Sequence, residues 1–174
     1  MANPRAVLLS EAEIAALIED VARRIAPRIS DDTVIVCLLT GGLWFAADLT
    51  RALARLDLHP LFDSMWLTSY GDARKTSGDV VLRAGLQRSV DGRQVLILDD
   101  VIDSGLSLEA ASLLAKEAGA REVLTAVFAR KPWPKPRPHT PDFVAWEAPE
   151  RFLVGYGMDA AGRYRGLGGV EALD

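Results

Sequence analysis

Several residue types that build common kinds of site are scarce in this chain. Its 174 residues contain one cysteine and two histidines. A single cysteine excludes an intramolecular disulfide and a metal site built from several cysteines. Cys37 lies in the apolar run 34–39, so a buried structural thiol is the better interpretation, with a nucleophile as the alternative.

Long hydrophobic runs are also absent. No apolar stretch reaches the roughly 18 residues of a membrane-spanning helix, and the N-terminus lacks the apolar core of a signal peptide. The net charge of −4 gives no general electrostatic reason to expect nucleic-acid binding. We therefore expect a cytoplasmic protein whose partners include neither a membrane nor a nucleic acid.

The overall composition is ordinary for a globular protein. Hydrophobic residues make up 49% of the chain, enough for a sizeable core, and no repeat or linker divides it, so we expect one domain over residues 1–174. Ser10 to Glu13 match a capping box before a helix that ends near Pro27. Strands are predicted at residues 33–39, 61–69, 80–82, 95–98, 122–129, 143–146 and 152–154, with helices after Gly42 and at about 104–117. This alternation predicts a mainly parallel sheet covered on both faces.

The most informative segment joins a buried strand to a helix through acidic residues. The apolar residues 95–98 run directly into Asp99, Asp100 and Asp103, and residues 104–105 open the next helical segment. Open α/β sheets bind ligands at the carboxyl ends of strands, where helix N–H groups attract anions and carboxylates attract Mg²⁺ or ribose hydroxyls. One Asp would be an ordinary helix cap, but three in five positions favour a site for a phosphorylated sugar and a metal.

This segment resembles the phosphoribosyl-pyrophosphate (PRPP) signature of the type I phosphoribosyltransferases. The C-terminal run from Pro141 to Arg165 is similar to the hypoxanthine–guanine branch of that family. Residues 38–51 resemble its pyrophosphate loop, and residues 69–79 resemble its mobile active-site loop. The likeness covers about residues 34 to 167, with the motifs in order.

The resemblance implies a type I phosphoribosyltransferase fold in two parts, with a mobile lid. The core would take about residues 30–130, and a small hood would take about residues 131–174 with contributions from the N-terminus. The polar segment 70–79 would close over the site, because an oxocarbenium-like state open to water would hydrolyse. The alternative for this segment is an ordinary surface hairpin.

The resemblance also implies roles for individual residues. Asp103 would be the general base for the purine N7 proton, with helix capping as its alternative role. The ribose and 5′-phosphate of PRPP would contact Asp99, Asp100, Asp103, Ser104, Gly105, Leu106 and Ser107. Pyrophosphate would contact Thr40, Gly41, Gly42, Ser69, Tyr70 and Arg165. The Mg²⁺ cofactor would be held by Asp99, Asp100 and Asp159.

The purine base would be read by a lysine and an aromatic ring. Lys131 stands where the family has the lysine that bonds the 6-oxo group, and a cationic donor prefers that oxygen to the amino group of adenine. Phe152 would stack on the base, and Leu153 and Asp159 would complete the base site. By residue type alone, a solvated lysine and a core phenylalanine would be the simpler interpretations.

The chain departs from the family pattern before the two glycines of the pyrophosphate loop. Relatives often have a lysine where this chain has Thr40, so the loop keeps its backbone contacts and loses a cation. In the family this loop carries a non-proline cis peptide. The pair Asp99 and Asp100 also replaces the Glu-Asp of many relatives, so the shorter side chain would reach ribose through Mg²⁺ or water.

The implied activity is Mg²⁺-dependent transfer of 5-phosphoribosyl from PRPP to N9 of hypoxanthine or guanine, giving IMP or GMP and pyrophosphate in purine salvage. A preference for xanthine, or a PRPP- or nucleotide-binding regulator without turnover, are the alternatives. A dinucleotide-binding dehydrogenase is disfavoured because no G-x-G-x-x-G follows a strand. By the same resemblance, we expect a homodimer or homotetramer.

Overall fold

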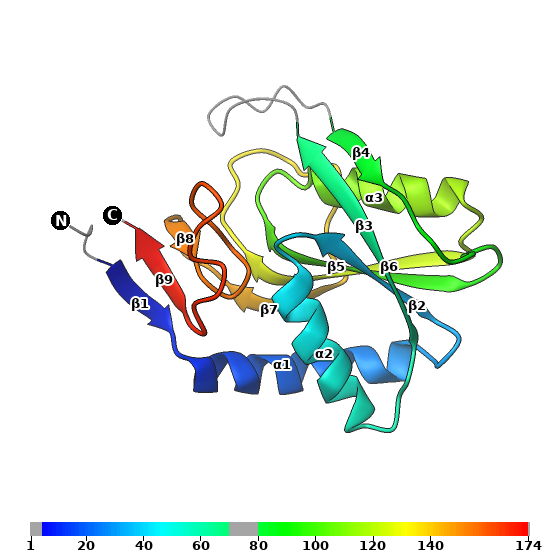
Figure 1. The fold of residues 1–174 in the computed structure, drawn as a ribbon, viewed down its shortest axis with the longest axis horizontal. Helices are drawn as coiled ribbons and strands as arrows, with labels where there is room; N and C mark the ends of the chain where they lie inside the picture. The colour runs from blue at the N-terminus through cyan, green and yellow to red at the C-terminus, as the bar shows by residue number, and fades with distance from the viewer. Residues whose placement is uncertain (1–4, 70–79, 174) are drawn as a thin grey trace.

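A six-stranded sheet forms the centre of the molecule (Figure 1). The computed structural model describes residues 5–69 and 80–173, so Tyr70 and the predicted lid at 70–79 lie outside the described residues. The sheet has the order β4-β3-β2-β5-β6-β7. Its strands are β2 (Val34–Leu39), β3 (Leu61–Ser69), β4 (Val80–Ala84), β5 (Gln94–Ile102), β6 (Glu122–Arg130) and β7 (Phe143–Glu147). All neighbours pair in parallel except β4, which is antiparallel to β3.

Helices cover both faces of this sheet, as the sequence predicts. α1 (Glu11–Ile25) and α2 (Leu43–Ala54) pack on one face, and α3 (Leu106–Glu117) packs on the other. The division follows from the two-residue period of a strand: Ile35 and Cys37 of β2 join the core under α1 and α2, whereas Val34 and Val36 join the core under α3. The predicted α/β fold is therefore confirmed.

The first helix begins and ends where the sequence indicates. Glu13 N donates to Ser10 Oγ at 3.3 Å, and Ser10 N donates to Glu13 Oε2 at 2.8 Å, which completes the capping box. A short 3₁₀ helix, Ala26–Arg28, follows α1 at the proline. None of the helices in the described ranges is long and apolar enough to cross a membrane.

A second, three-stranded antiparallel sheet lies beside the first and pairs the first described strand of the chain with the last (Figure 1). Its order is β1 (Arg5–Leu9), β9 (Val170–Leu173) and β8 (Phe152–Val154). β1 and β9 were not predicted. Of the strands within residues 131–174, β7 pairs with β6 in the large sheet, and only β8 and β9 build the small one.

The acidic segment differs from its prediction in two respects. The strand predicted at residues 95–98 continues to Ile102, so Asp99 and Asp100 lie in β5 and not in a turn. The cause is the ladder with β6, which pairs residues as far as Ile102 with Arg130. The hydrophobic run ends at Leu98, but the backbone pairing does not. The following helix begins at Leu106 and not at Ser104.

Cys37 gives a test of the packing of β2. It is fully buried, and burial, with the charges of Asp99 and Asp100, raises the pKa of its thiol to about 12. Because the thiolate is the reactive form, we expect no measurable labelling by a thiol reagent at pH 8 while the chain is folded, and one labelled thiol per chain in denaturant. Rapid labelling of the native chain would contradict this packing.

Candidate active site at the carboxyl edge of the sheet

Two adjacent carboxylates mark the carboxyl end of β5. Asp99 and Asp100 are partly exposed there, and each accepts a hydrogen bond from the next backbone N–H, at 3.0 and 2.8 Å. Burial and the neighbouring charge of Asp100 raise the pKa of Asp99 well above its usual value, and burial raises the pKa of Asp100. A cation beside these two carboxylates would compensate for their burial and mutual repulsion. The pair therefore suits a metal ion.

The loop after β2 lies directly against these carboxylates. A Cβ on Gly41 would meet Asp100 Oδ2 at 1.9 Å, and a Cβ on Gly42 would meet Leu38 O at 2.7 Å, so neither position has room for a side chain. The Leu39–Thr40 peptide is cis, as the resemblance implies, and Thr40 is exposed. The N–H of Gly42 donates to Leu38 O at 3.1 Å and is thus engaged within the loop.

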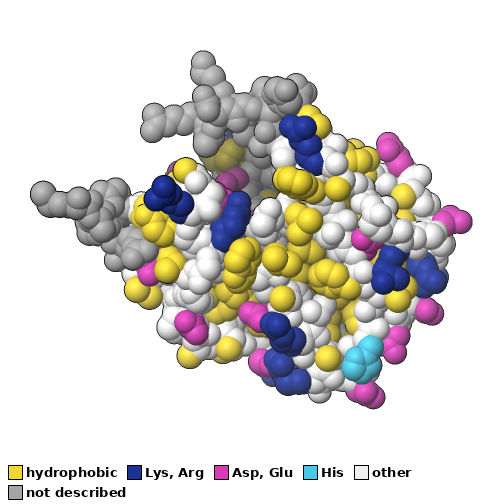
Figure 2. Space-filling view, in the orientation of Figure 1, with side chains coloured by type: hydrophobic (Ala, Val, Ile, Leu, Met, Phe, Trp, Pro, Cys, Tyr) yellow, Lys and Arg dark blue, Asp and Glu magenta, His cyan; other side chains and the backbone are white. Residues whose placement is uncertain are grey.

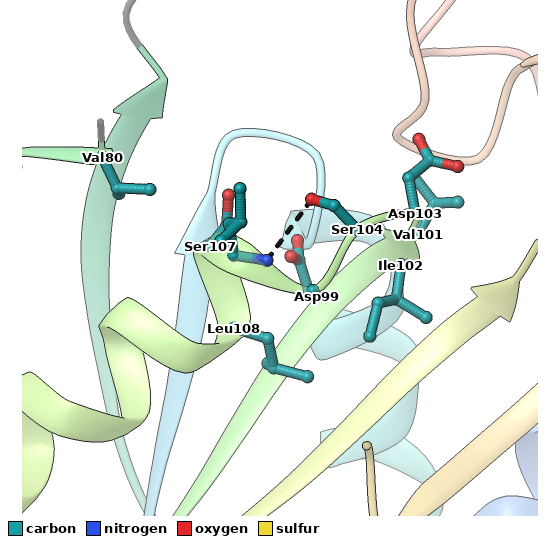
Figure 3. A pocket seen from close by; sticks show the side chains of 10 residues that line it. Val80, Asp99, Val101, Ile102, Asp103, Ser104, Ser107 and Leu108 are labelled. Atoms are coloured by element: carbon teal, nitrogen blue, oxygen red, sulfur yellow. Dashed lines mark hydrogen bonds between the residues drawn. The ribbon is translucent and has the colours of Figure 1, made fainter. Parts of the chain in front are cut away.

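The turn from β5 into α3 encloses a small cavity of about 180 Å³. Its lining consists of Asp99, residues 101–108 and Val80. Gly105 turns the chain with φ of 84°, and Figure 3 shows Asp99, Ser104 and Ser107 around the start of α3. The first N–H groups of a helix have no partner within it and attract anions. The cavity therefore combines a carboxylate, hydroxyl groups and a helix N-terminus.

A second, more open cavity of about 420 Å³ lies on the other side of Asp103. Its lining residues are Asp103, Lys131, Pro132, Trp133, Pro134, Glu150, Arg151 and Phe152. Lys131 Nζ is 3.8 Å from Asp103 Oδ1, and the Lys131 side chain is only 19% exposed. Phe152 is 52% exposed, so its ring is not in the core. Lys131 is therefore not a fully solvated lysine, and Phe152 is not a core phenylalanine.

Asp103 borders both cavities, and this position is the central geometric feature of the site. Its carboxylate is half-exposed, and it lies between the helix N-terminus of the small cavity and the lysine of the open one. A molecule with an anionic end and a flat polar end can occupy both spaces and present its middle to Asp103.

Comparison with known proteins agrees with this geometry. Residues 10–161 match the family model described as the phosphoribosyl transferase domain. The chain belongs to this family. It is 35% identical to the hypoxanthine-guanine phosphoribosyltransferase of Bacillus subtilis over 96% of this chain and 92% of the relative. It is 34% identical to the hypoxanthine phosphoribosyltransferase of Escherichia coli over 97% of this chain and 96% of the relative.

Solved structures show the same relationship. A hypoxanthine phosphoribosyltransferase variant from Trypanosoma cruzi, in a ternary complex with its substrates, superimposes with a TM-score of 0.87 at 28% identity. The match covers 99% of this chain and 96% of that one. This phosphoribosyltransferase thus shares both sequence and fold with its relatives over nearly its whole length.

The loop between β8 and β9 of this phosphoribosyltransferase brings Arg165 to the loop after β2. Arg165 Nη2 lies 2.7 Å from Asp159 Oδ1, and Nη1 donates to Gly157 O at 2.5 Å. A Cβ on Gly157 would meet Gly41 O at 2.1 Å, so the two loops are in close contact. The structure therefore places Arg165 beside the predicted pyrophosphate loop.

Three other residues predicted to belong to the site, Asp159, Leu153 and Ser69, do not line either cavity. Both carboxylate oxygens of Asp159 already have partners, Arg165 and the N–H of Gly162 at 2.6 Å. The side chain of Leu153 is buried in the small sheet, which leaves its backbone to address a base. Ser69 ends β3, beside the segment that the structure does not describe.

Sequence reasoning missed several contacts of the site. Trp133 borders the open cavity, and Arg137 bonds to backbone carbonyls there. Tyr156, just after β8, donates to Asp48 Oδ2 of α2 at 2.9 Å. In the sequence, Trp133 and Arg137 stand among prolines, and Tyr156 stands between two glycines. Such patterns are too common in loops to indicate a site.

Gly41 allows a test of the contact between the two loops and Asp100. We expect Gly41→Ala to lower turnover by about 10²-fold, because the new methyl group displaces the Asp100 carboxylate, and misplacement of a site group by about 1 Å has that effect. Overpacking by one methyl group costs about 1–3 kcal/mol of the free energy of unfolding. Turnover and thermal unfolding would be measured on the same preparations.

Gly166→Ala is the matched control, because a Cβ there meets nothing within 4 Å. We expect it to leave turnover and stability unchanged. Wild-type turnover in Gly41→Ala would show that the approach of Gly41 to Asp100 does not matter for activity.

Proposed function

We propose that this enzyme catalyses the Mg²⁺-dependent transfer of 5-phosphoribosyl from PRPP to N9 of a 6-oxopurine, hypoxanthine or guanine. The products are IMP or GMP and pyrophosphate, and the role is purine salvage. The observation that carries the proposal is the position of Asp103 between a cavity suited to a sugar phosphate and a cavity suited to a base. Relatives named for this activity cover nearly the whole chain.

The 5′-phosphate end binds in the small cavity. Backbone N–H groups at the start of α3 and the hydroxyls of Ser104 and Ser107 donate to the phosphate oxygens. Asp99, on the same wall, faces the ribose hydroxyls. This arrangement fixes C1′ of the ribose at the boundary with the open cavity, which is where the new bond must form.

The base binds in the open cavity. Phe152 offers an exposed ring for stacking, and the ammonium of Lys131 donates to the 6-oxo oxygen. Asp103 then faces N7 and accepts its proton as N9 bonds to C1′. The ammonium 3.8 Å away stabilises the carboxylate before transfer, and it stabilises the oxo group afterwards.

The leaving pyrophosphate is stabilised from the opposite side. The C1′–O bond breaks ahead of N9 bonding, through an oxocarbenium-like state. Arg165 and the amide of Gly41 face the departing oxygens, while Gly42, whose amide bonds to Leu38, shapes the loop. Thr40 adds only backbone contacts.

The residues at the end of β5 suit Mg²⁺. Among the residues described, no three His, Cys, Asp or Glu side chains are grouped to hold a metal by themselves. Mg²⁺ is usually bound by one or two carboxylates, waters and substrate phosphates, which is what the adjacent Asp99 and Asp100 offer. When bound, Mg²⁺ neutralises charge on pyrophosphate. Asp159 orients Arg165, and by the family resemblance it would help to hold the ion through the ion's water shell.

A homodimer or homotetramer and a cytoplasmic location stay predictions from the family resemblance. An apolar surface suits association: Leu43, Phe62 and Trp66 are each at least 40% exposed. Figure 2 shows hydrophobic side chains gathered over the centre of the face in view, where Figure 1 places α2 and β3. The lid at residues 70–79 likewise stays a prediction.

The activity is tested by pyrophosphate release from PRPP and Mg²⁺, with hypoxanthine, guanine, xanthine, adenine or uracil supplied separately. We expect turnover with hypoxanthine and guanine and little with adenine, whose 6-amino group does not accept a bond from Lys131. Turnover that is highest with xanthine would change the preferred substrate. Tight binding of PRPP or IMP without turnover on any base would favour a regulator.

Asp103→Asn tests the proton transfer within the same assay. An amide cannot accept the N7 proton, so we expect kcat to fall by about 10²–10⁴-fold with IMP binding retained. Asp57→Asn is the matched control, since Asp57 is fully exposed and far from the site in the chain, and Asn tolerates its positive φ. Full activity of Asp103→Asn would show that another group accepts the proton.

A further inference from the structure

The proline-rich segment between β6 and β7 carries one side chain that bonds to both sides of the site. Arg137 Nε donates to the backbone oxygen of Asp103 at 2.7 Å. Its Nη2 donates to the backbone oxygen of Lys131. A guanidinium holds its donors in one rigid plane. Arg137 therefore fixes the backbone of the proposed general base relative to the backbone of the residue that reads the 6-oxo group.

The bond to Asp103 also orients the turn that follows. In a trans peptide the C=O and the next N–H point in opposite directions. With the oxygen of Asp103 held by Arg137, the N–H of Ser104 is directed away from the proline-rich segment. The small cavity is lined by Ser104 and the residues after it. Arg137 thus fixes the orientation of the Asp103–Ser104 peptide, which lies between the base end and the phosphate end of the proposed site.

The bond to Lys131 completes a second constraint. Lys131 N donates to Ile102 O at 3.2 Å, so the N–H side of this residue is fixed to β5. The carbonyl side accepts from Arg137, and the next residue, Pro132, has no N–H to offer. Lys131 is consequently held on both sides of its Cα, which limits where its ammonium can lie.

The segment that presents Arg137 is itself anchored two residues later. His139 Nδ1 lies 3.1 Å from Glu109 Oε2 on α3, and Nε2 lies 3.0 Å from Thr125 Oγ1 on β6. A Cβ on Gly105 would meet His139 O at 3.1 Å, so the segment rests on the start of α3. Arg137 thus extends from a fixed backbone and does not need to be ordered by substrate.

We propose that Arg137 is a positioning residue that sets the separation of Lys131 and Asp103. Those two side chains lie 3.8 Å apart in the structure. The bound base must meet both of them, O6 at the lysine and N7 at the carboxylate, while N9 faces C1′. Arg137 touches neither substrate nor reacting atoms, and it acts through the two backbone oxygens. The inference rests on the function proposed above.

Arg137→Gln and Arg137→Lys test this role in steady-state kinetics with hypoxanthine and PRPP. Gln cannot reach both oxygens, so we expect kcat to fall by about 10–100-fold and KM for hypoxanthine to rise, with a smaller change in KM for PRPP. Lys reaches one oxygen at a time and should restore part of the kcat. Lys135→Gln is the matched control, because Lys135 is exposed on the same segment.

The outcomes separate this inference from the proposed function. An inactive wild-type enzyme on every base would overturn the proposed function, and the inference with it. An active wild type with Arg137→Gln indistinguishable from Lys135→Gln would overturn the inference alone. A lower melting temperature with unchanged kcat and KM per folded enzyme would mean a merely structural role and would overturn it too. If Arg137→Gln does not fold, Arg137→Lys decides: wild-type kcat and KM for hypoxanthine would contradict the proposal.

Discussion

Parallel pairing of β5 with both β2 and β6 is the constraint on which the site depends. Parallel neighbours place their carboxyl ends at the same edge, so the loops after β2, β5 and β6 open beside one another. These loops contain the glycines at 41 and 42, the turn at 103–105 and Lys131. The small sheet and its β8–β9 loop add Phe152 and Arg165 at the same edge. Residues far apart in sequence become neighbours because of this one arrangement.

Some features of the candidate site lower the free energy of unfolding, and the function of the site explains why they are present. Asp99 and Asp100 lie side by side in a strand, with raised pKa values, and Gly41 lies so close that only a glycine fits. Two neighbouring carboxylates of this kind cost free energy in the folded chain, and the cation proposed to bind beside them would offset that cost. Functional sites commonly break the rules that the core obeys.

The sequence allowed most of the core, and the part of the site that follows β5, to be predicted. Apolar runs located the six strands of the large sheet, and the acidic segment indicated the edge of the sheet at which the candidate site lies. β1 and β9 were missed because each is short and is stabilised by pairing between opposite ends of the chain. The extension of β5 was missed because Asp99 and Asp100 interrupt the hydrophobic pattern while the ladder continues. Arg137 was missed because its partners are backbone oxygens, which leave no trace in side-chain spacing.

A crystal structure of the enzyme with IMP would show whether one ligand occupies both cavities that Asp103 borders. We expect the 5′-phosphate at the N-terminus of α3 and the base on Phe152. O6 should lie within hydrogen-bond distance of Lys131 Nζ, and N7 should face the carboxylate of Asp103. A phosphate bound away from the 103–107 turn, or a base that contacts neither Lys131 nor Asp103, would contradict it.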